Sequence, residues 1–495
     1  MNPPALTADP EVLGDMDPET FHRSAISVAE WIRHYLNTPD DHPVLARVAP
    51  GAVTSTLPAA APERGEPMPR ILDDFQRILV PALTHWNHPG FLAYFASSGS
   101  GPGVLAEFLA AALNQQAMLW RTSPAATELE AVTLGWLRRL LGLPDSFEGV
   151  IYDGGSAANL HGLMAAREAA VPEIRARGLA NRTDLPPLRV YCSEHAHSSI
   201  DKAVIVLGLG HQALRKIPVD DEYRLRPDLL QTALAADRAA GLLPVAVVAT
   251  VGTTGTASVD PVDAIAEICR AMGVWLHVDA SYAGPAAMVR QHAWIFAGVP
   301  EADSLVVNPH KWLFTPLDIS TLYTRHMDVL RRAMALSPDY LETFGADSVR
   351  NLMDTGIALG RRFRALKLWM VLRYFGAEGI RARITEHVRL AQLFATWVDG
   401  DSDFERLAPT RLSVVCFRAA PTGLDPERLE RLNAAILDRV NGSGEVFLSH
   451  TRLRGRFTLR LAVGQIRTTE AHVARAWQLL RDSLAAARVD RWRGI

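Results

Sequence analysis

The sequence predicts an α/β protein whose main sheet is mostly parallel and doubly wound. From about residue 86 to 375, short apolar runs alternate with helical patterns, as in "GVIYDGG" (149–155) before "AANLHGLMAAREAA" and "PVAVVATVG" (244–252) before "PVDAIAEICRAMG". Such alternation is typical of a parallel sheet with helices on both faces. The longest apolar run, near residues 242–252, is far too short to cross a bilayer, so it indicates a buried strand.

The predicted elements divide the chain into three parts. Residues 1–85 look helical, but the Pro- and Gly-rich stretch 49–69 indicates an arm rather than a compact domain. Residues 86–376 form the large α/β domain, with further strands expected at 188–194, 274–281 and 304–309 and a closing helix over 359–376. Residues 377–495 form a small α+β domain, with a strand at 412–419, a helix at 424–440 and a hairpin-like pair at 444–464.

The composition excludes several functional classes. The chain has 495 residues, a formal net charge of −3, 48% apolar residues and 21% charged residues, so we expect no basic surface for nucleic acid or an anionic membrane. The N-terminus has neither a basic start nor an apolar signal segment, so a cytoplasmic protein is expected. The three cysteines are widely spaced, and "EHAH" at 194–197 has no second ligand cluster, so we predict neither a disulfide framework nor a metal site.

Chemically active residues follow the ends of the predicted strands. The "DGGSAAN" turn (153–159) opens a helix with small residues, which leaves backbone N–H groups free for an anion, although a turn that binds nothing has the same pattern. His197 precedes an expected helix cap at Ser198. Asp279 and Lys311 each follow an apolar run, where a charged group needs a partner or a function. Because ligands of α/β sheets bind at the carboxyl ends of the strands, these groups are expected in one site.

This set of groups fits pyridoxal 5′-phosphate. The cofactor's aldehyde needs a lysine amine for a Schiff base, and its pyridine nitrogen needs an acid partner. Its phosphate needs an anion-binding turn, and its ring needs a flat partner on the face away from the lysine. Lys311, Asp279, the 153–159 turn and His197 supply these four requirements. The spacing from Asp279 to Lys311 also fits one strand, one crossover and the next strand.

The motifs "NPHKWL", "HVDASYAG", "HSSIDKA" and "GVIYDGGSAANL" resemble those of the group II pyridoxal-phosphate-dependent decarboxylases, and the aromatic-L-amino-acid decarboxylases look closest. The resemblance continues through "THWNHPGFLAYF" (84–95), "TSPAATELE" (122–130), "LGRRFRALKLW" (359–369) and "RGRFTLRLAVG" (454–464). It covers nearly the whole chain beyond the first two dozen residues. It implies the type I fold of aspartate aminotransferase and a homodimer with shared active sites, to which residues 1–85 would contribute a dimerisation segment.

The resemblance implies a role for each matching residue. Lys311 would form the Schiff base, Asp279 would pair with the pyridinium, and His197 would stack on the ring. Tyr340, in the polar stretch 335–351, would lie on a mobile lid and return a proton to the α-carbon. The other cofactor-binding residues that the resemblance implies are Gly154, Gly155, Ser156, Ala280, Asn308, His310 and one or both of Thr253 and Thr254.

The implied substrate pocket is largely aromatic and draws partly on the partner chain. Gly360, before a double arginine, would leave room for a bicyclic ring. Gln116 stands where relatives often have an apolar residue, so it could bond a ring hydroxyl or an indole N–H, or indicate a non-aromatic substrate. The full set that the resemblance implies is Trp86, Tyr94, Phe95, Gln116, Met118 and Gly360. Tryptophan, 5-hydroxytryptophan, tyrosine and dihydroxyphenylalanine are the candidate substrates.

Three other activities compete with simple decarboxylation on this fold. Aldehyde-forming relatives tend to replace the loop tyrosine by phenylalanine or the stacking histidine by asparagine, whereas Tyr340 and His197 are both of the decarboxylase type. An aminotransferase would need a guanidinium for the substrate carboxylate, for which Arg460 is the candidate. A decarboxylase of a non-aromatic amino acid is the third. A silent scaffold protein would be expected to have lost Lys311, Asp279 or His197, and all are present.

Overall fold

The computed structural model describes residues 14–336 and 349–489, and its larger sheet has seven strands in the order β1-β7-β6-β5-β4-β2-β3. Strands β2 to β6 all run parallel to one another, whereas β7 lies antiparallel between β1 and β6. The predicted mainly parallel sheet is therefore confirmed. The strands are β1 (Glu148–Tyr152), β2 (Leu188–Ser193), β3 (Leu214–Ile217), β4 (Leu243–Thr250), β5 (Trp275–Asp279), β6 (Ser304–Val307) and β7 (Ser320–Thr324).

Helices cover both faces of this sheet because the side chains of its buried strands alternate between two cores. In β4, Val247 and Ala249 enter one core while Ala246 and Val248 enter the other. The first core is closed by α6 (Pro124–Leu140), α10 (Pro227–Ala239), α11 (Val262–Met272) and the start of α13 (Ala365–Asp399). The second core is closed by α7 (Gly155–Ala170), α8 (Ile174–Arg177), α9 (Ser198–Val206) and α12 (Met327–Met334).

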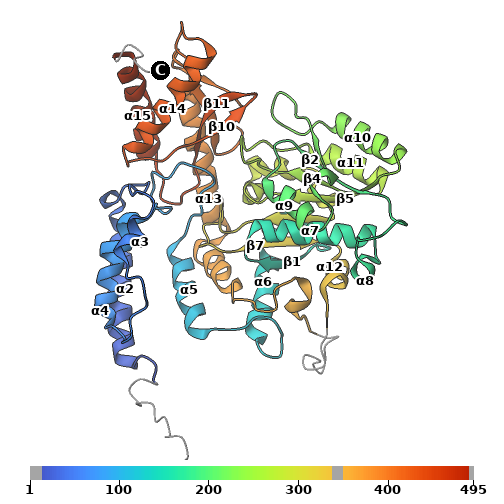
Figure 1. Cartoon of the computed structure of the whole chain (residues 1–495), viewed down its shortest axis with the longest axis horizontal. Coiled ribbons are helices and arrows are strands. Elements are labelled where there is room, and N and C mark those ends of the chain that lie inside the picture. The colour runs from blue at the N-terminus through green and yellow to red at the C-terminus, as the bar shows by residue number, and fades with distance from the viewer. Residues whose placement is uncertain (1–13, 337–348, 490–495) are drawn as a thin grey trace, which may run out of the picture.

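The second sheet is antiparallel, in the order β10-β11-β9-β8, and packs on helices from the C-terminal part of the chain (Figure 1). Its strands are β8 (Phe404–Arg406), β9 (Val414–Ala419), β10 (Ser449–Leu453) and β11 (Arg456–Ala462). The helices that pack on it are the later part of α13, α14 (Pro426–Gly442) and α15 (Glu470–Val489). The backbone of Gly376, with φ 62° and ψ 172°, interrupts α13 at the proposed limit of the large domain.

The helix predicted over 359–376 begins too early, because α13 starts at Ala365. Its predicted end matches the non-helical backbone of Gly376, beyond which a second helical stretch runs to Asp399. The residues before Ala365 follow another segment instead of coiling. The N–H of Arg361 donates to the Gln116 side chain at 2.6 Å, and its carbonyl accepts the N–H of Ala117 at 2.8 Å. These bonds use backbone groups that a helix would need for its own hydrogen bonds.

The N-terminal helices α2 (Pro18–Asn37), α3 (Ala52–Thr56) and α4 (Met68–Asp74) lie on the side away from the large sheet, with α5 (Gly101–Leu113) between (Figure 1). No residue of α2 is buried. The division into 1–85, 86–376 and 377–495, in which the first part is an arm, stays a prediction. In the described part of the chain, no helix combines the length and the apolar character that spanning a bilayer requires.

Candidate active site

A cavity of about 330 Å³ lies at the carboxyl ends of the parallel strands and brings most of the predicted cofactor-binding residues together. The predicted residues that line it are Phe95, Gly154, Gly155, Ser156, His197, Thr254, Asp279, Asn308, His310 and Lys311. The cavity therefore lies where ligands of parallel α/β sheets bind, at the carboxyl ends of the strands, as expected for the predicted site. Tyr340 lies outside the described residues, so its position in this site stays a prediction.

Lys311 lies four residues beyond the end of β6, on the wall of this cavity. Burial lowers the pKa of its ammonium group; nearby Asp279 opposes this shift and Arg460 adds to it. The Lys311 Nζ lies 5.7 Å from the centroid of the Phe95 ring. A desolvated lysine with a lowered pKa has more of the unprotonated amine that a carbonyl compound requires.

Asp279 is the last residue of β5 and is 5% exposed. Its Oδ1 accepts the N–H of Ser281 at 3.0 Å, and its Oδ2 accepts Nδ2 of Asn159 at 2.9 Å. Burial alone would raise the pKa of Asp279, but the Ser281 hydrogen bonds, the nearby Lys311 charge and the Asn159 amide outweigh it, so the pKa lies below its ordinary value. The carboxylate is therefore held ionised and can stabilise a cationic group placed beside it.

His197 is itself the N-cap of α9, so the cap expected at Ser198 is wrong by one residue. Its Nδ1 accepts the N–H of Ser199 at 3.1 Å and lies 2.9 Å from the Ser199 hydroxyl. An imidazole nitrogen can accept the same backbone N–H as the carboxylate or hydroxyl of an ordinary N-cap residue. Histidine is not among the preferred N-cap residues, so the sequence did not indicate this cap. Burial lowers the pKa of His197, so the ring is neutral at pH 7 and carries its proton on Nε2.

The turn after β1 has the shape of an anion-binding site. Gly154 caps α7 without a side-chain hydrogen bond, so the first N–H groups of a 16-residue helix have no side-chain cap. A Cβ on Gly155 would lie 2.5 Å from Nδ2 of Asn308, so only glycine allows this close approach. The buried hydroxyl of Thr250, which also lines the cavity, has no partner among the described residues. These features fit the phosphate and polar ring substituents of pyridoxal phosphate.

The two threonines that the sequence could not separate have different environments. Thr253 is fully buried, and its hydroxyl lies 3.0 Å from that of Thr256 and accepts the N–H of Ser258 at 3.1 Å. Thr254 lines the cavity, as Thr253 does not. Ala280, buried next to Asp279, does not line the cavity either.

Aromatic rings form one wall of the site. Phe95 stacks on Tyr282 with 3.6 Å between ring centroids, and Tyr282 stacks on Trp312 at 4.7 Å. Arg460 lies over Phe95 at 4.6 Å and donates to the carbonyl groups of Tyr94, at 2.6 Å, and Gly255, at 3.1 Å. Arg460 therefore supports this wall, while its buried Nη2 has no partner among the described residues.

The other predicted substrate residues lie apart from Lys311 within this chain. Gln116, Met118 and Gly360 do not line the Lys311 cavity, and neither do Trp86 and Tyr94, whose rings stack at 6.1 Å with 42% and 52% exposure. Gln116 and Gly360 are neighbours, since a Cβ on Gly360 would lie 3.4 Å from Nε2 of Gln116. The Gln116 carbonyl oxygen is already bound to the Arg361 N–H.

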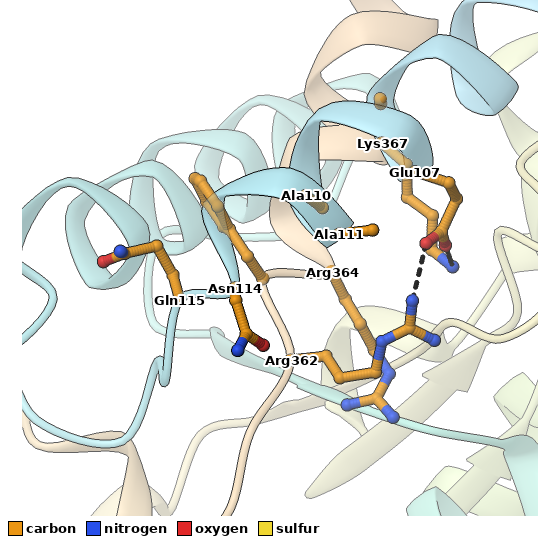
Figure 2. A pocket seen from close by; sticks show the side chains of 10 residues that line it. Glu107, Ala110, Ala111, Asn114, Gln115, Arg362, Arg364 and Lys367 are labelled. Carbon is orange, nitrogen blue, oxygen red and sulfur yellow. Dashed lines mark hydrogen bonds and ion pairs between the residues drawn. The ribbon is translucent and has the colours of Figure 1, made fainter. Parts of the chain in front are cut away.

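A separate hollow of about 280 Å³ lies between α5 and the start of α13 (Figure 2). The Glu107 carboxylate accepts hydrogen bonds from Nζ of Lys367 and from Nη2 of Arg362, the latter at 2.7 Å. Asn114 and Gln115 lie at the other end of the hollow (Figure 2). This hollow contains none of the residues that line the Lys311 cavity.

Several residues of the site were missed by sequence reasoning. Asn159, Ser199 and Ser281 bond to Asp279 or His197, and Tyr282 carries the aromatic wall. Asn159 stands one turn after Gly155 in the "DGGSAAN" stretch, so its position on the helix face toward the strand ends was the available signal. The small polar residues gave none, because serine is common at helix starts for structural reasons.

Known proteins match this chain over nearly its whole length. The family model described as "Pyridoxal-dependent decarboxylase conserved domain" matches residues 50–420. Tyrosine decarboxylase 2 of Arabidopsis thaliana is 41% identical, covering 94% of this chain and 86% of the relative, and phenylacetaldehyde synthase of the same plant is 39% identical, covering 95% and 97%. A solved structure of Oryza sativa TDC with PLP and tryptamine has a TM-score of 0.92 and 35% identity, covering 96% of this chain and 99% of that one.

These matches agree with the sheet topology. The fold is the type I fold of pyridoxal-phosphate enzymes, and the cofactor is pyridoxal 5′-phosphate. The chain belongs to the pyridoxal-phosphate-dependent amino-acid decarboxylases of group II.

Proposed function

We propose that the protein decarboxylates an aromatic L-amino acid to the corresponding amine and carbon dioxide. The observation that carries this proposal is the stack of Phe95, Tyr282 and Trp312, whose outer ring lies 5.7 Å from the Lys311 amine. A flat apolar wall next to the reactive amine suits an indole or phenol ring. Relatives named as tyrosine decarboxylase and as tryptophan decarboxylase support the same substrate class.

The residues of the cavity have the groups that the cofactor needs. Lys311 would hold its aldehyde, Asp279 its ring nitrogen, and the N–H groups that follow Gly154 its phosphate. His197 would lie on the face of the ring, and Asn308 and His310 would lie near the phosphate and the aldehyde. When bound, the cofactor supplies an aldehyde that condenses with amines and a ring that accepts the electrons released as carbon dioxide leaves.

The protein groups then control charge and protons. Asp279 stays ionised, since its pKa is lowered, and keeps a cationic partner protonated. His197 is neutral and presents its Nε2–H, because Ser199 donates to its Nδ1. Tyr340, helped by His197, would return a proton to the α-carbon of the product. Burial and Lys311 lower the pKa of His310 to about 4, so this ring stays neutral and adds no second cation beside the lysine.

We also propose a homodimer in which each chain completes the substrate pocket of the other. Four large apolar side chains of α5 are at least half exposed, which is unusual for a surface that faces water. They are Leu105, Phe108, Leu109 and Leu113. Gln116 comes shortly after the end of α5, and Gly360 lies next to it. Neither residue lines the Lys311 cavity of its own chain. A second copy placed over α5 and the hollow of Figure 2 would bury the apolar side chains and supply both residues to the partner's cavity.

A panel of L-amino acids with product identification tests this function. Tryptophan, 5-hydroxytryptophan, tyrosine and dihydroxyphenylalanine should release carbon dioxide and yield the amine, and the Lys311→Ala variant should not. The matching phenylacetaldehyde synthase makes the aldehyde the main alternative product. Aldehyde as the major product would replace the decarboxylase proposal, and activity on glutamate or diaminobutyrate alone would refute the aromatic one.

A further inference from the structure

A hydrogen-bonded chain of buried side chains leads from the start of β5 to the Asp279 carboxylate at its end. Asn159 of α7, which is 1% exposed, uses both N–H bonds of its amide, one to Oδ2 of Asp279 and one to the hydroxyl of Ser199, each at 2.9 Å. Its carbonyl oxygen lies 2.9 Å from Nε2 of His277, which is fully buried under α7. Asn159, Ser199 and His277 are all absent from the predicted set of site residues.

The Asp279 carboxylate determines the direction of every bond in this chain. An ionised carboxylate only accepts hydrogen bonds, so the amide nitrogen of Asn159 must face it and the amide oxygen must face His277. Nε2 of His277 must therefore carry a proton. Burial lowers the pKa of His277 to about 4, so the ring is neutral and its Nδ1 has no proton. Nδ1 accepts the hydroxyl of Ser304 at 2.7 Å.

The hydrogen-bonded chain continues to the amino end of β5. The Ser304 oxygen accepts the indole N–H of Trp275 at 2.9 Å, and Trp275 is the first residue of β5. The donors then run in one direction, from Trp275 through Ser304, His277 and Asn159 to Asp279. Hydrogen bonds aligned in this way polarise one another in a low-dielectric interior. The aligned chain should therefore strengthen the Asn159 bond that keeps Asp279 charged.

A branch of the same network reaches His197. The second N–H of Asn159 occupies the acceptor side of the Ser199 hydroxyl, so the hydroxyl proton is free to point at Nδ1 of His197, 2.9 Å away. The backbone N–H of Ser199 donates to the same Nδ1. Asn159 thus contacts groups that hold both functional side chains, the acid and the neutral histidine.

The packing of α7 leaves space for His277 at this point. Gly162 is three residues after Asn159, on the same helix face. A Cβ on Gly162 would lie 2.5 Å from Cε1 of His277 and 2.7 Å from its Nδ1. The imidazole therefore fits only because residue 162 is glycine, and the helix brings the Asn159 amide directly onto it.

We propose that Asn159 and His277 are positioning residues that hold Asp279 as the acceptor for the cofactor's ring nitrogen and keep the proton of His197 on Nε2. This proposal rests on the pairing of Asp279 with that nitrogen in the proposed function. Neither residue is a catalytic residue, since each acts through Asp279 or His197. A network that only fills the core would affect folding, whereas this one also sets how strongly the site prefers a ring that carries a nitrogen.

The test measures that preference by binding. The full-length protein, freed of cofactor, is titrated with pyridoxal phosphate and with its 1-deaza analogue, in which a C–H replaces the ring nitrogen. The ratio of the two dissociation constants isolates the contact with Asp279, because loss of fold affects both ligands alike. The readout needs no turnover. The melting temperature of each cofactor-free variant checks its folding.

Two substitutions of one histidine form the matched pair. Gln in His277→Gln places an amide N–H where Nε2 was and can still donate to Asn159, whereas Asn in His277→Asn reaches only the Nδ1 position, toward Ser304. We expect His277→Gln to keep the wild-type preference and His277→Asn to lose about tenfold of it, which corresponds to about 1.4 kcal/mol. Asn159→Ala should lose at least as much, since it removes the donor itself.

The outcomes separate this proposal from the one that it rests on. Equal preference in the Gln and Asn variants of His277, with the wild type still preferring pyridoxal phosphate, would overturn the positioning role and leave the Asp279 pairing intact. A wild type that binds both ligands equally would overturn the pairing and the positioning role together. If both His277 variants melt far below the wild type, Asn159→Ala decides by the same ratio.

Discussion

The substitution Gly155→Ala probes the anion-binding turn with a magnitude that the structure supplies. The new Cβ would lie 2.5 Å from Nδ2 of Asn308, 3.1 Å from its Oδ1 and 3.2 Å from the Ser281 hydroxyl. Asn308 cannot easily turn away, because it is 2% exposed and its Oδ1 accepts the Ser320 hydroxyl at 2.6 Å. Overpacking of this kind costs about 1–3 kcal/mol. The helix-propensity gain of alanine offsets at most about 1 kcal/mol.

The assay is the melting temperature of the cofactor-free protein together with its affinity for pyridoxal phosphate. With an unfolding entropy of about 2.1 cal/mol/K per residue over a large domain of about 290 residues, the overpacking cost alone should lower the melting temperature by roughly 2–5 °C, and the propensity gain should restore at most roughly 2 °C of this. Affinity should fall as well, because Asn308 moves. Gly154→Ala is the matched control for melting, since its Cβ would meet no atom of the described residues within 4 Å and the φ of Gly154 is −156°. Equal melting temperatures for the two variants would refute the steric reasoning.

Three further predictions test other parts of the account. Because His277, His310 and His387 have pKa values of about 4 in the fold and about 6.5 unfolded, only the unfolded chain binds these protons between those values. Stability should therefore fall from pH 6.5 toward pH 4 by up to about 1.4 kcal/mol per pH unit for each histidine, and His277→Gln should show a smaller slope in melting scans than the wild type; equal slopes would contradict this. In Gly360→Ser the new Cβ would meet, within the part of the chain that the structure describes, only Nε2 of Gln116 at 3.4 Å, so the variant should fold normally. It should raise the kcat/KM for tyrosine relative to tryptophan several-fold, and an unchanged ratio would remove Gly360 from the pocket. Phe108→Glu should turn the proposed dimer into monomers in light-scattering measurements, because it places a charge on a surface that the partner would bury. A variant that stays dimeric would place the interface elsewhere.

That the candidate residues would line one cavity was predictable, because it depends on which residue types follow the strands. An acid, a lysine, a histidine and a glycine turn at successive carboxyl ends had to meet at one edge of a parallel sheet. The order of the strands along the chain was therefore enough to predict that Lys311, Asp279 and His197 would meet. The sheet also includes β3 and β7, which were not predicted. β7 enters antiparallel between β1 and β6, against the βαβ pattern on which the prediction was based.

Side-chain contacts between distant segments were not predictable. Asn159 and His277 meet across 118 positions of sequence, and each has an ordinary structural explanation on its own. The start of α13 at Ala365 depends on the bonds from Arg361 to Gln116 and Ala117, which no helical period reveals. Likewise, Thr254 rather than Thr253 lines the cavity because Thr253 is used within its own loop, by Thr256 and Ser258.

The central claim is that Lys311 holds the cofactor through its amine, and chemical trapping tests it most directly. The purified holoenzyme is reduced with borohydride, which makes a lysine–cofactor link permanent, then digested and analysed by mass spectrometry. The account predicts that the phosphopyridoxyl group is found on the peptide that contains Lys311, and that no lysine carries it in the Lys311→Ala variant. Attachment to another lysine, or no attachment in a wild-type protein that contains the cofactor, would contradict it.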